Sequence, residues 1–577
     1  MRLKVTRSKN AASLYVIKSM YKNGKNTSKI VEKLGTYEEL LRRLDGRDPI
    51  AWAHEYIDGL NREEKANQRK VMVQYSPTRL IDPGQQRLFS GGYLFLQKIY
   101  HELGLCGICR SIARRHDFSF DLNSILSRLV YGRVLFPASK LATCTLSEGL
   151  LEPPNFELQH VYRALEVLAK EGDFIQSQLY ENSLKLSKRN TGVLYYDCTN
   201  FFFEIEQSDE DGLRQYGYSK DHKPNPIVQM GLFMDGDGVP LAFCIHSGNT
   251  NEQTTLQPLE QKILSDFALS RFVVCTDAGL SSADNRKFND RQDRAFITTQ
   301  SIKKLNAELR EWALEPTGWQ LDPHRRLPGD PEYFDITQLN PESDLEKTFY
   351  KERWIKQEGL RQRLIVSFSL KYMCYQQTVR AGQIERAQKS IGTNQAKPTA
   401  NQNDHRRFIK KTNVTLEGEV APKTLLSIDA DRIEAEAMYD GFYGVCTNLD
   451  DPIADILAVY RRRWEIEESF RIMKSEFKAR PVYLSRDDRI KAHFCTCFIA
   501  LIIFRLLEKR LQEKYTCHQI IDTLKAMNFL EIKGEGYTPT YTRTPLTDDL
   551  HHAFGFNTDF QIITKSQMKK ISSLTKS

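Results

Sequence analysis

Two aspartates follow apolar segments that are typical of buried strands. Asp197 comes directly after residues 193–196, and Asp277 follows residues 272–276, whose first four are Phe-Val-Val-Cys. A carboxylate at the carboxyl end of a strand points into the crevice where α/β sheets bind their ligands. One such aspartate is usually a turn residue. Two of them at matching positions on neighbouring strands favour a shared chemical site.

A third carboxylate lies on a predicted long helix, from about residue 452 to 478. At 3.6 residues per turn, each residue of a helix is rotated by about 100° from the one before it. Four polar side chains then form a stripe about 60° wide, next to an apolar stripe that would face the core. With the first taken as zero, they lie at about 0°, 300°, 340° and 320° and are Tyr460, Arg463, Glu467 and Lys474.

The neighbouring acid on this helix, Glu468, falls near 80° and points away from the stripe. Glu467 is therefore the better candidate for the site. An ordinary amphipathic helix with an Arg463–Glu467 ion pair one turn apart is the alternative interpretation. It accounts for one pair, but less well for Tyr460 and Lys474 on the same line.

Three carboxylates suit hard divalent cations, so Asp197, Asp277 and Glu467 are the candidate catalytic residues and metal ligands. Mg²⁺ prefers oxygen ligands and keeps several waters, which leaves room for phosphate oxygens. Two such ions about 3.5–4 Å apart can stabilise both oxygens of an in-line displacement at phosphorus. Arg463 and Lys474 would hold neighbouring phosphates, and Tyr460 would donate to a phosphate or stack on a displaced base.

The elements that must position these residues alternate as in an α/β protein. Strands are predicted at 193–197, 227–234, 239–245, 272–275 and 295–297, with helices at 251–268 and 281–290. Three antiparallel strands followed by a helix, a strand, a helix and a strand predict a mixed five-stranded sheet flanked by helices. This order resembles the RNase H-like core.

The rest of the chain predicts further regions around this core. We expect a basic β-hairpin and helical region at 1–80 and a helical, DNA-binding domain at 81–190. The core would begin at 191–300, be interrupted by an inserted, partly β domain at 301–440, and resume at 441–511 with the glutamate helix. Residues 512–577 would form a tail for dimerisation or DNA contact. The apolar run 494–507 is too short to span a membrane and predicts a buried helix.

Several motifs together resemble the DDE transposases of bacterial insertion sequences. The spacing of Tyr460, Arg463, Glu467 and Lys474 resembles the subgroup with a Tyr-x2-Arg-x3-Glu-x6-Lys signature. Asp197 in Tyr-Tyr-Asp-Cys-Thr-Asn and Asp277 in Cys-Thr-Asp-Ala-Gly-Leu resemble the two catalytic aspartates of that group. Segments 133–140, 217–222 and 248–249 also resemble family segments. The similarity covers roughly residues 80–510.

This resemblance implies a catalytic triad of Asp197, Asp277 and Glu467. It implies Mg²⁺-dependent cleavage at transposon ends, with Mn²⁺ as a substitute, and then attack of the freed 3′-OH on target DNA. It further implies double-stranded DNA as partner, both as terminal inverted repeats and as target, and a homodimer that pairs two ends. A bacterial cytoplasmic protein that acts at the nucleoid, with no membrane partner, is expected.

Charge is unevenly distributed along the chain. Residues 1–31 hold eight Lys or Arg and no Asp or Glu, whereas the whole chain has a net charge of +8. Such an arm favours a polyanion partner, although a solvated basic edge explains the charge equally well. Lys220 and His222 lie in a polar loop, either as DNA or active-site residues or as part of a solvated hairpin.

Two other functions remain open at this point. An RNase H-fold nuclease would use the same three carboxylates to activate water, without strand transfer. A DNA-binding derivative without catalysis would need no metal ligands, so an intact triad argues against it.

Overall fold

The computed structural model describes residues 1–8, 11–22, 25–67, 71–73, 76–321, 326–392, 398–399, 404–414 and 420–577. Contacts within the chain define two compact units. The first contains residues 1–85 and 532–535, and the second contains residues 86–531 and 536–577.

The first unit is a three-stranded antiparallel sheet with two helices. Its strands are β1 (Arg2–Arg7), β2 (Ala12–Lys22) and β3 (Lys25–Thr36), and its helices are α1 (Tyr37–Arg43) and α2 (Pro49–Asn67). Pairing of β2 with β3 confirms the predicted hairpin, whose turn at 23–24 lies outside the described residues. Leu14, Leu40 and Ala53 form its core, and Thr36 begins α1 with a capping box.

A helical region lies in the second unit, as the sequence predicts for the stretch up to residue 190. Its helices are α3 (Tyr93–Glu102), α4 (Leu105–Ala113), α5 (Leu122–Leu135), α6 (Lys140–Glu148), α7 (Leu158–Lys170) and α8 (Gly172–Leu186). The C-terminal segment folds with them as α17 (Asp487–Arg510), α18 (Cys517–Ala526), α19 (Pro545–Phe554) and α20 (Lys565–Leu574). A small sheet of order β18-β17-β16-β4 joins the two segments; its strands are β4 (Leu88–Ser90), β16 (Asn528–Ile532), β17 (Gly536–Pro539) and β18 (Ile563–Thr564).

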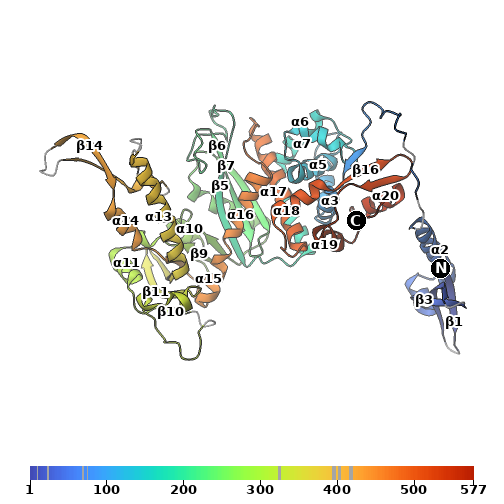
Figure 1. The fold of residues 1–577 in the computed structure, drawn as a ribbon, viewed down its shortest axis with the longest axis horizontal. Coiled ribbons are helices and arrows are strands. Elements are labelled where there is room, and N and C mark those ends of the chain that lie inside the picture. The colour runs from blue at the N-terminus through green and yellow to red at the C-terminus, as the bar shows by residue number, and fades with distance from the viewer. Residues whose placement is uncertain are drawn as a thin grey trace. The chain divides into compact units, whose positions relative to one another are not determined.

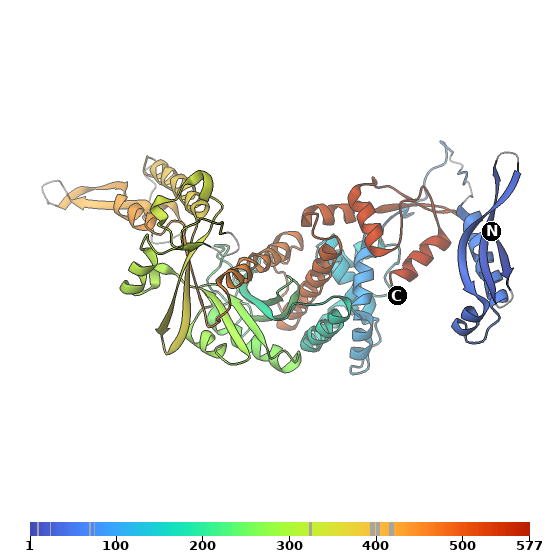
Figure 2. The same ribbon diagram turned by 90° about the horizontal axis from the view of Figure 1, so that it is seen from below.

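Helix α17 confirms the predicted buried helix. By length and composition it is the one helix in the described chain that could cross a membrane, yet 89% of its apolar window is buried inside the protein. It packs against α5, α7 and the last strand of the central sheet. Figures 1 and 2 show α17 running between this sheet and the helical region. Its apolar side chains therefore join the two parts of the core.

The central sheet has nine strands rather than the predicted five. Its order is β10-β11-β12-β15-β9-β8-β5-β6-β7. The five predicted strands are its β5 (Val193–Phe202), β6 (Ile227–Asp235), β7 (Pro240–Ser247), β8 (Phe272–Thr276) and β9 (Arg294–Thr299). β8 is parallel to both β5 and β9, and the other neighbours described are antiparallel. Helices α9 (Leu256–Asp266) and α10 (Ala283–Phe288) come between these strands.

The remaining four strands come from the segment expected as an insertion and from the strand that follows it. They are β10 (Gln320–Leu321), β11 (Phe349–Gln357), β12 (Leu360–Phe368) and β15 (Phe442–Thr447). β15 pairs with β9, and β12 pairs with β15, so the segment extends the central sheet. Its other elements are α11 (Ala307–Leu314), α12 (Pro341–Asp344), α13 (Leu370–Gly392), α14 (Ala430–Ala437) and the hairpin β13 (Ile409–Val414) with β14 (Val420–Ile428). This hairpin projects beyond α13 and α14 (Figure 1).

The predicted helix 452–478 is interrupted. It forms α15 (Ile453–Arg461), a turn at Arg462 and Arg463, α16 (Trp464–Arg471) and a π-helical turn over Ile472–Glu476. Across the break, Glu465 and Ile466 donate to carbonyls three residues back instead of four. The uniform 100° rotation that predicted a single stripe does not apply here, because three-residue and five-residue hydrogen bonds change the rotation per residue.

Candidate active site

Strands β5 and β8 bring the two aspartates to the same level of the sheet. Their last described partners are Tyr195 and Cys275, and Asp197 and Asp277 each lie two residues further along. β8 ends at Thr276, so Asp277 follows the strand as predicted. The sequence predicts that the first strand ends at Asp197, which is wrong. β5 continues to Phe202, because β6 pairs with it along its whole length from Leu194.

The environment of Asp197 raises its pKa to about 7. Burial is the main cause, and the nearby Asp277 carboxylate adds to it, while Lys220 and Arg463 oppose the rise. The Asp277 carboxylate accepts hydrogen bonds from the backbone N–H groups of Gly279, at 2.9 Å, and Leu280, at 3.2 Å. These bonds fix the orientation of the Asp277 side chain near Asp197. Two adjacent carboxylates, one of them costly to ionise, fit the oxygen-donor set of a hard divalent cation.

Glu467 lies on α16 and faces Arg463 rather than the aspartates. Its carboxylate is 2.7 Å from the Arg463 guanidinium, and its side chain is 55% exposed. In the part of the chain that the structure describes, no three acidic, histidine or cysteine side chains lie close enough to hold one metal ion. The structure therefore brings the aspartates together and links Glu467 to them through an arginine.

Arg463 and Tyr460 lie at the break between α15 and α16. Although burial opposes it, Tyr460 and Glu467 raise the pKa of Arg463 above its usual value. The Nε of Arg463 is buried and has no hydrogen-bond partner within the described residues. The Tyr460 hydroxyl, predicted to contact DNA, lies 2.5 Å from the Thr299 hydroxyl and also contacts Tyr443. Tyr460 thus anchors α15 to strands β9 and β15.

Lys474 approaches Asp197 from the π-helical turn. Its ammonium group donates to the Thr199 hydroxyl on β5, at 2.7 Å. Burial lowers its pKa to about 8. The contact places Lys474 two residues along the strand from Asp197, as a candidate phosphate ligand.

Lys220 is a further cation at the site. Its ammonium group donates to the Cys198 carbonyl and pairs with Glu252 at 3.0 Å. Although burial opposes it, Asp197 and Glu252 raise the pKa of Lys220. The sequence singled out Lys220 without choosing a role for it, whereas Glu252 was missed because a lone glutamate after a strand carries no distinctive pattern.

Two glycines explain how the Lys220 loop is held. A Cβ on Gly217 would lie 1.9 Å from the carbonyl oxygen of Gly248, so the two backbones touch. Gly248 in turn donates from its backbone N–H to Leu213, at 3.1 Å. These glycines lie in segments that resemble family segments in the sequence. This approach requires glycine at 217, and glycine is required at 248 because a Cβ there would lie 2.2 Å from the Ile227 carbonyl oxygen and 2.3 Å from that of Gln215.

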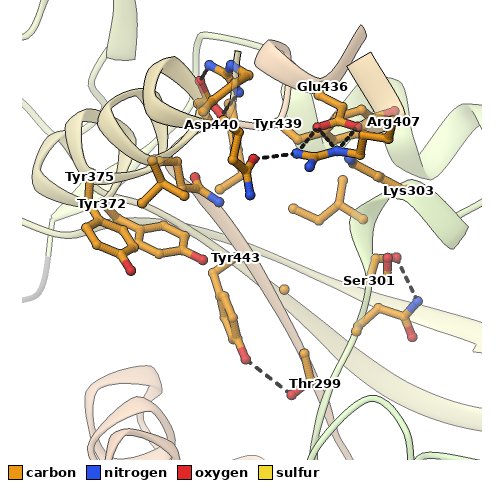
Figure 3. A pocket seen from close by; sticks show the side chains of 18 residues that line it. Thr299, Ser301, Lys303, Tyr372, Tyr375, Arg407, Glu436, Tyr439, Asp440 and Tyr443 are labelled. Atoms are coloured by element: carbon orange, nitrogen blue, oxygen red, sulfur yellow. Dashed lines mark hydrogen bonds and ion pairs between the residues drawn. The ribbon is translucent and has the colours of Figure 1, made fainter. Parts of the chain in front are cut away.

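Tyr443 lines two pockets near the site. One, of about 460 Å³, is lined by Glu467, Arg463, Trp464, Tyr372 and Tyr443 among others. The other, of about 500 Å³, lies between α13 and strands β9 and β15 and is drawn in Figure 3. Its tyrosines come from α13, from the segment before β15 and from β15 itself, and its cations are Lys303, Arg380 and Arg407. Arg407 is paired with Glu436 and Arg380 with Asp440.

The sequence matches the family model of the transposase DDE domain over residues 201–503, which is more than half of the chain. The chain therefore belongs to this family of DDE transposases. The matched span contains Asp277 and the whole row from Tyr460 to Lys474, and it begins four residues after Asp197.

Comparison with other proteins adds little to this assignment. The solved piggyBac transposase synaptic complex with hairpin DNA is similar at 8% identity and a TM-score of 0.36, over 85% of this chain and 88% of that chain. This similarity is too low to carry an argument about fold or site. No curated protein matches the chain.

Proposed function

We propose that this DDE transposase is the enzyme of a bacterial insertion sequence, of the subgroup with the Tyr-x2-Arg-x3-Glu-x6-Lys signature. The placement of Asp197 and Asp277 two residues beyond paired residues of β5 and β8 is the observation that carries the proposal. The strand order β7-β6-β5-β8-β9 supports an RNase H-like core around them. The spacing of the row from Tyr460 to Lys474 supports the subgroup.

The triad in this proposal is Asp197, Asp277 and Glu467. These carboxylates would hold Mg²⁺, for which Mn²⁺ substitutes because both ions favour carboxylate and water ligands. The bound metal supplies stabilisation of the charge that develops on oxygen as a phosphodiester bond is cleaved and rejoined. For Glu467 to join the aspartates, its carboxylate must leave the Arg463 guanidinium.

The cations of the site have separate roles in this proposal. Arg463, released from Glu467, binds a phosphate of the DNA strand as a planar fork. Lys474 binds a neighbouring phosphate as a point charge, and the phosphate replaces its contact with Thr199. Tyr460, whose hydroxyl is bonded within the protein, acts mainly by holding α15 in place, and contacts DNA only when those bonds open.

The partners follow from the reaction. The substrates are the two terminal inverted repeats of the element and a target duplex, and two copies of the chain pair the ends as a homodimer. The protein acts on the bacterial nucleoid from the cytoplasm.

Cleavage and joining by the purified protein test the proposal. The substrate is duplex DNA with the sequence that borders the gene, incubated with Mg²⁺ and a supercoiled target plasmid. We expect a nick that leaves a 3′-OH at the element's end, followed by covalent joining of that end to the plasmid. Asp197→Asn and Asp277→Asn should abolish both steps and leave DNA binding intact.

Each departure from this result has a meaning. Cleavage without joining would favour the alternative, a nuclease that uses the same residues to activate water. DNA binding without cleavage by the wild-type protein would favour a non-catalytic derivative. Cleavage by the Asp197→Asn variant would remove Asp197 from the chemistry.

A further inference from the structure

Two loops meet at the end of β5, a few residues beyond Asp197. The first is residues 216–223, and the second is residues 478–486, which follow the π-helical turn. The backbone carbonyl of Tyr218 accepts a hydrogen bond from the Asn200 side chain, at 3.0 Å. On the other loop, Val482 donates its N–H to the carbonyl of Phe202, at 2.9 Å.

The two loops are also joined to each other and held in shape. Asp221 of the first loop forms an ion pair with Arg480 of the second. The first loop is fixed at Gly217 by its contact with Gly248. His222 and Lys478 adopt left-handed backbone conformations, at φ values of 54° and 45°, which residues other than glycine seldom take. Such conformations persist where the surrounding structure enforces them.

These loops present aromatic rings and cations to solvent, which we call the tyrosine surface: Tyr218, Tyr483, Lys220, Lys223 and Arg480. The Tyr218 side chain is 75% exposed and that of Tyr483 is 69% exposed. Lys223 and Arg480 each lie 5.8 Å from the centre of the Phe202 ring. Large exposed rings on the same loops as cations are a combination that binds single-stranded nucleic acid.

The tyrosine surface continues directly from the catalytic aspartate. Lys220 belongs to the surface and also contacts the carbonyl of Cys198, the residue after Asp197. Lys474 contacts Thr199, which lies on the same strand between Asp197 and the residues that the two loops contact. A DNA strand with a phosphate at Asp197 would therefore pass Lys474 and reach the two tyrosines without leaving the protein.

We propose that the tyrosine surface binds the DNA strand that continues from the phosphate held at Asp197, and that it binds this strand with its bases unpaired. This inference rests on the proposed function, because it needs DNA at the triad. Unpaired bases are required because the faces of paired bases are covered by their neighbours in the duplex, whereas an unpaired base stacks freely on an exposed ring. The cations Lys220, Lys223 and Arg480 would contact the phosphates.

Binding of two DNA probes to the full chain tests this inference. Both carry the duplex end of the element; in one the DNA beyond the cleavage site is fully paired, and in the other it is unpaired. We expect wild-type protein to bind the unpaired probe more tightly. The double variant Tyr218→Ala/Tyr483→Ala should lose at least about fivefold in affinity for that probe and keep its affinity for the paired one.

Two matched variants separate stacking from other effects. Tyr218→Phe/Tyr483→Phe keeps both rings and should bind the unpaired probe like wild type. Tyr333→Ala removes a 55% exposed tyrosine from a different segment and should change neither affinity. Thermal unfolding of each variant at the wild-type temperature shows that the fold is retained.

The possible contrary results would overturn different claims. Unchanged binding of both probes by the double alanine variant would overturn the tyrosine surface and leave the proposed function standing. An equal loss on both probes would also overturn it, because the rings would then not select unpaired bases. Wild-type protein that binds neither probe would overturn the proposed function together with this inference.

Discussion

Arg463 interacts with both Glu467 and Asp197. It forms an ion pair with Glu467 and also lowers the pKa of Asp197 by its charge. The helical stripe predicted from the sequence places Arg463 and Glu467 next to each other, with separate roles. The structure shows an ion pair between Arg463 and Glu467 instead, and the proposed function requires a DNA phosphate to replace the glutamate on the arginine.

Lys140 is a buried cation that gives a prediction about pH. It is 6% exposed, and burial, with a contribution from Arg133, lowers its pKa to about 7. The unfolded chain binds this proton below about pH 10.5, whereas the folded protein does so only below about pH 7, so the charge destabilises the fold throughout the lower range. Burial, with contributions from Arg133 and Lys140, also lowers the pKa of His493 well below its usual value.

Lys140→Met should therefore stabilise the protein by about 1–4 kcal/mol at pH 7. The gain should shrink steadily between pH 7 and pH 10.5, where the lysine becomes neutral in both states. Chemical denaturation at several pH values measures it. Lys371→Met, at a 64% exposed side chain paired with Glu346, is the control and should change little. A gain that does not depend on pH would contradict the assignment of the effect to charge.

At the scale of elements, the site depends on how three segments end or break. The helix that carries Glu467 breaks at Arg462 and Arg463, which places Arg463 at the start of α16. The π-helical turn then carries Lys474 to Thr199. The loop with Lys220 brings this lysine to the Cys198 carbonyl, next to Asp197, and the loop depends on the contact between Gly217 and Gly248.

Gly217→Ala should displace this loop, because the new methyl group would overlap the carbonyl oxygen of Gly248. We expect a loss of stability of about 1–3 kcal/mol and a fall in cleavage rate beyond that explained by unfolding. Gly172→Ala, where the structure offers open space, is the matched control and should leave both unchanged. Wild-type cleavage by Gly217→Ala would show that the loop does not position the site.

Much of the core could be predicted from the sequence, because its strands are apolar and bounded by polar turns. The five strands from β5 to β9 and the buried helix α17 follow from such local patterns. The joining of β12 to β15 could not be predicted, because it depends on pairing between residues about 80 positions apart. The break in the glutamate helix also escaped, since Arg462 and Arg463 favour helix and no local breaker residue marks a turn there.

At the scale of the whole molecule, the basic arm and the catalytic site lie in different units. Residues 1–31 belong to the first unit, and all three carboxylates of the triad belong to the second. DNA affinity and catalysis should therefore be separable. The charge of the arm would supply affinity that does not depend on sequence, and the second unit would supply the chemistry.

Neutralising Lys4 and Lys29 of the arm to Gln should weaken DNA binding and reduce its dependence on salt. Each lost phosphate contact lowers the slope of log affinity against log salt concentration by about 0.9. Neutralising Lys371 and Lys389, exposed lysines of the second unit paired with Glu346 and Glu385, is the control. A slope equal to that of wild type would show that the arm is a solvated basic edge that makes no phosphate contacts.

The central claim is that Glu467, and not its neighbour, completes the catalytic site. Glu468 pairs with Arg471 at 3.0 Å and with Arg505 at 3.4 Å, whereas Glu467 pairs with Arg463 at 2.7 Å. The direct measurement is excision in cells of a marker flanked by the DNA that borders the gene, with wild type, Glu467→Gln and Glu468→Gln compared at equal protein levels. The account predicts excision by wild type and Glu468→Gln and none by Glu467→Gln. Excision by Glu467→Gln at the wild-type frequency would contradict it.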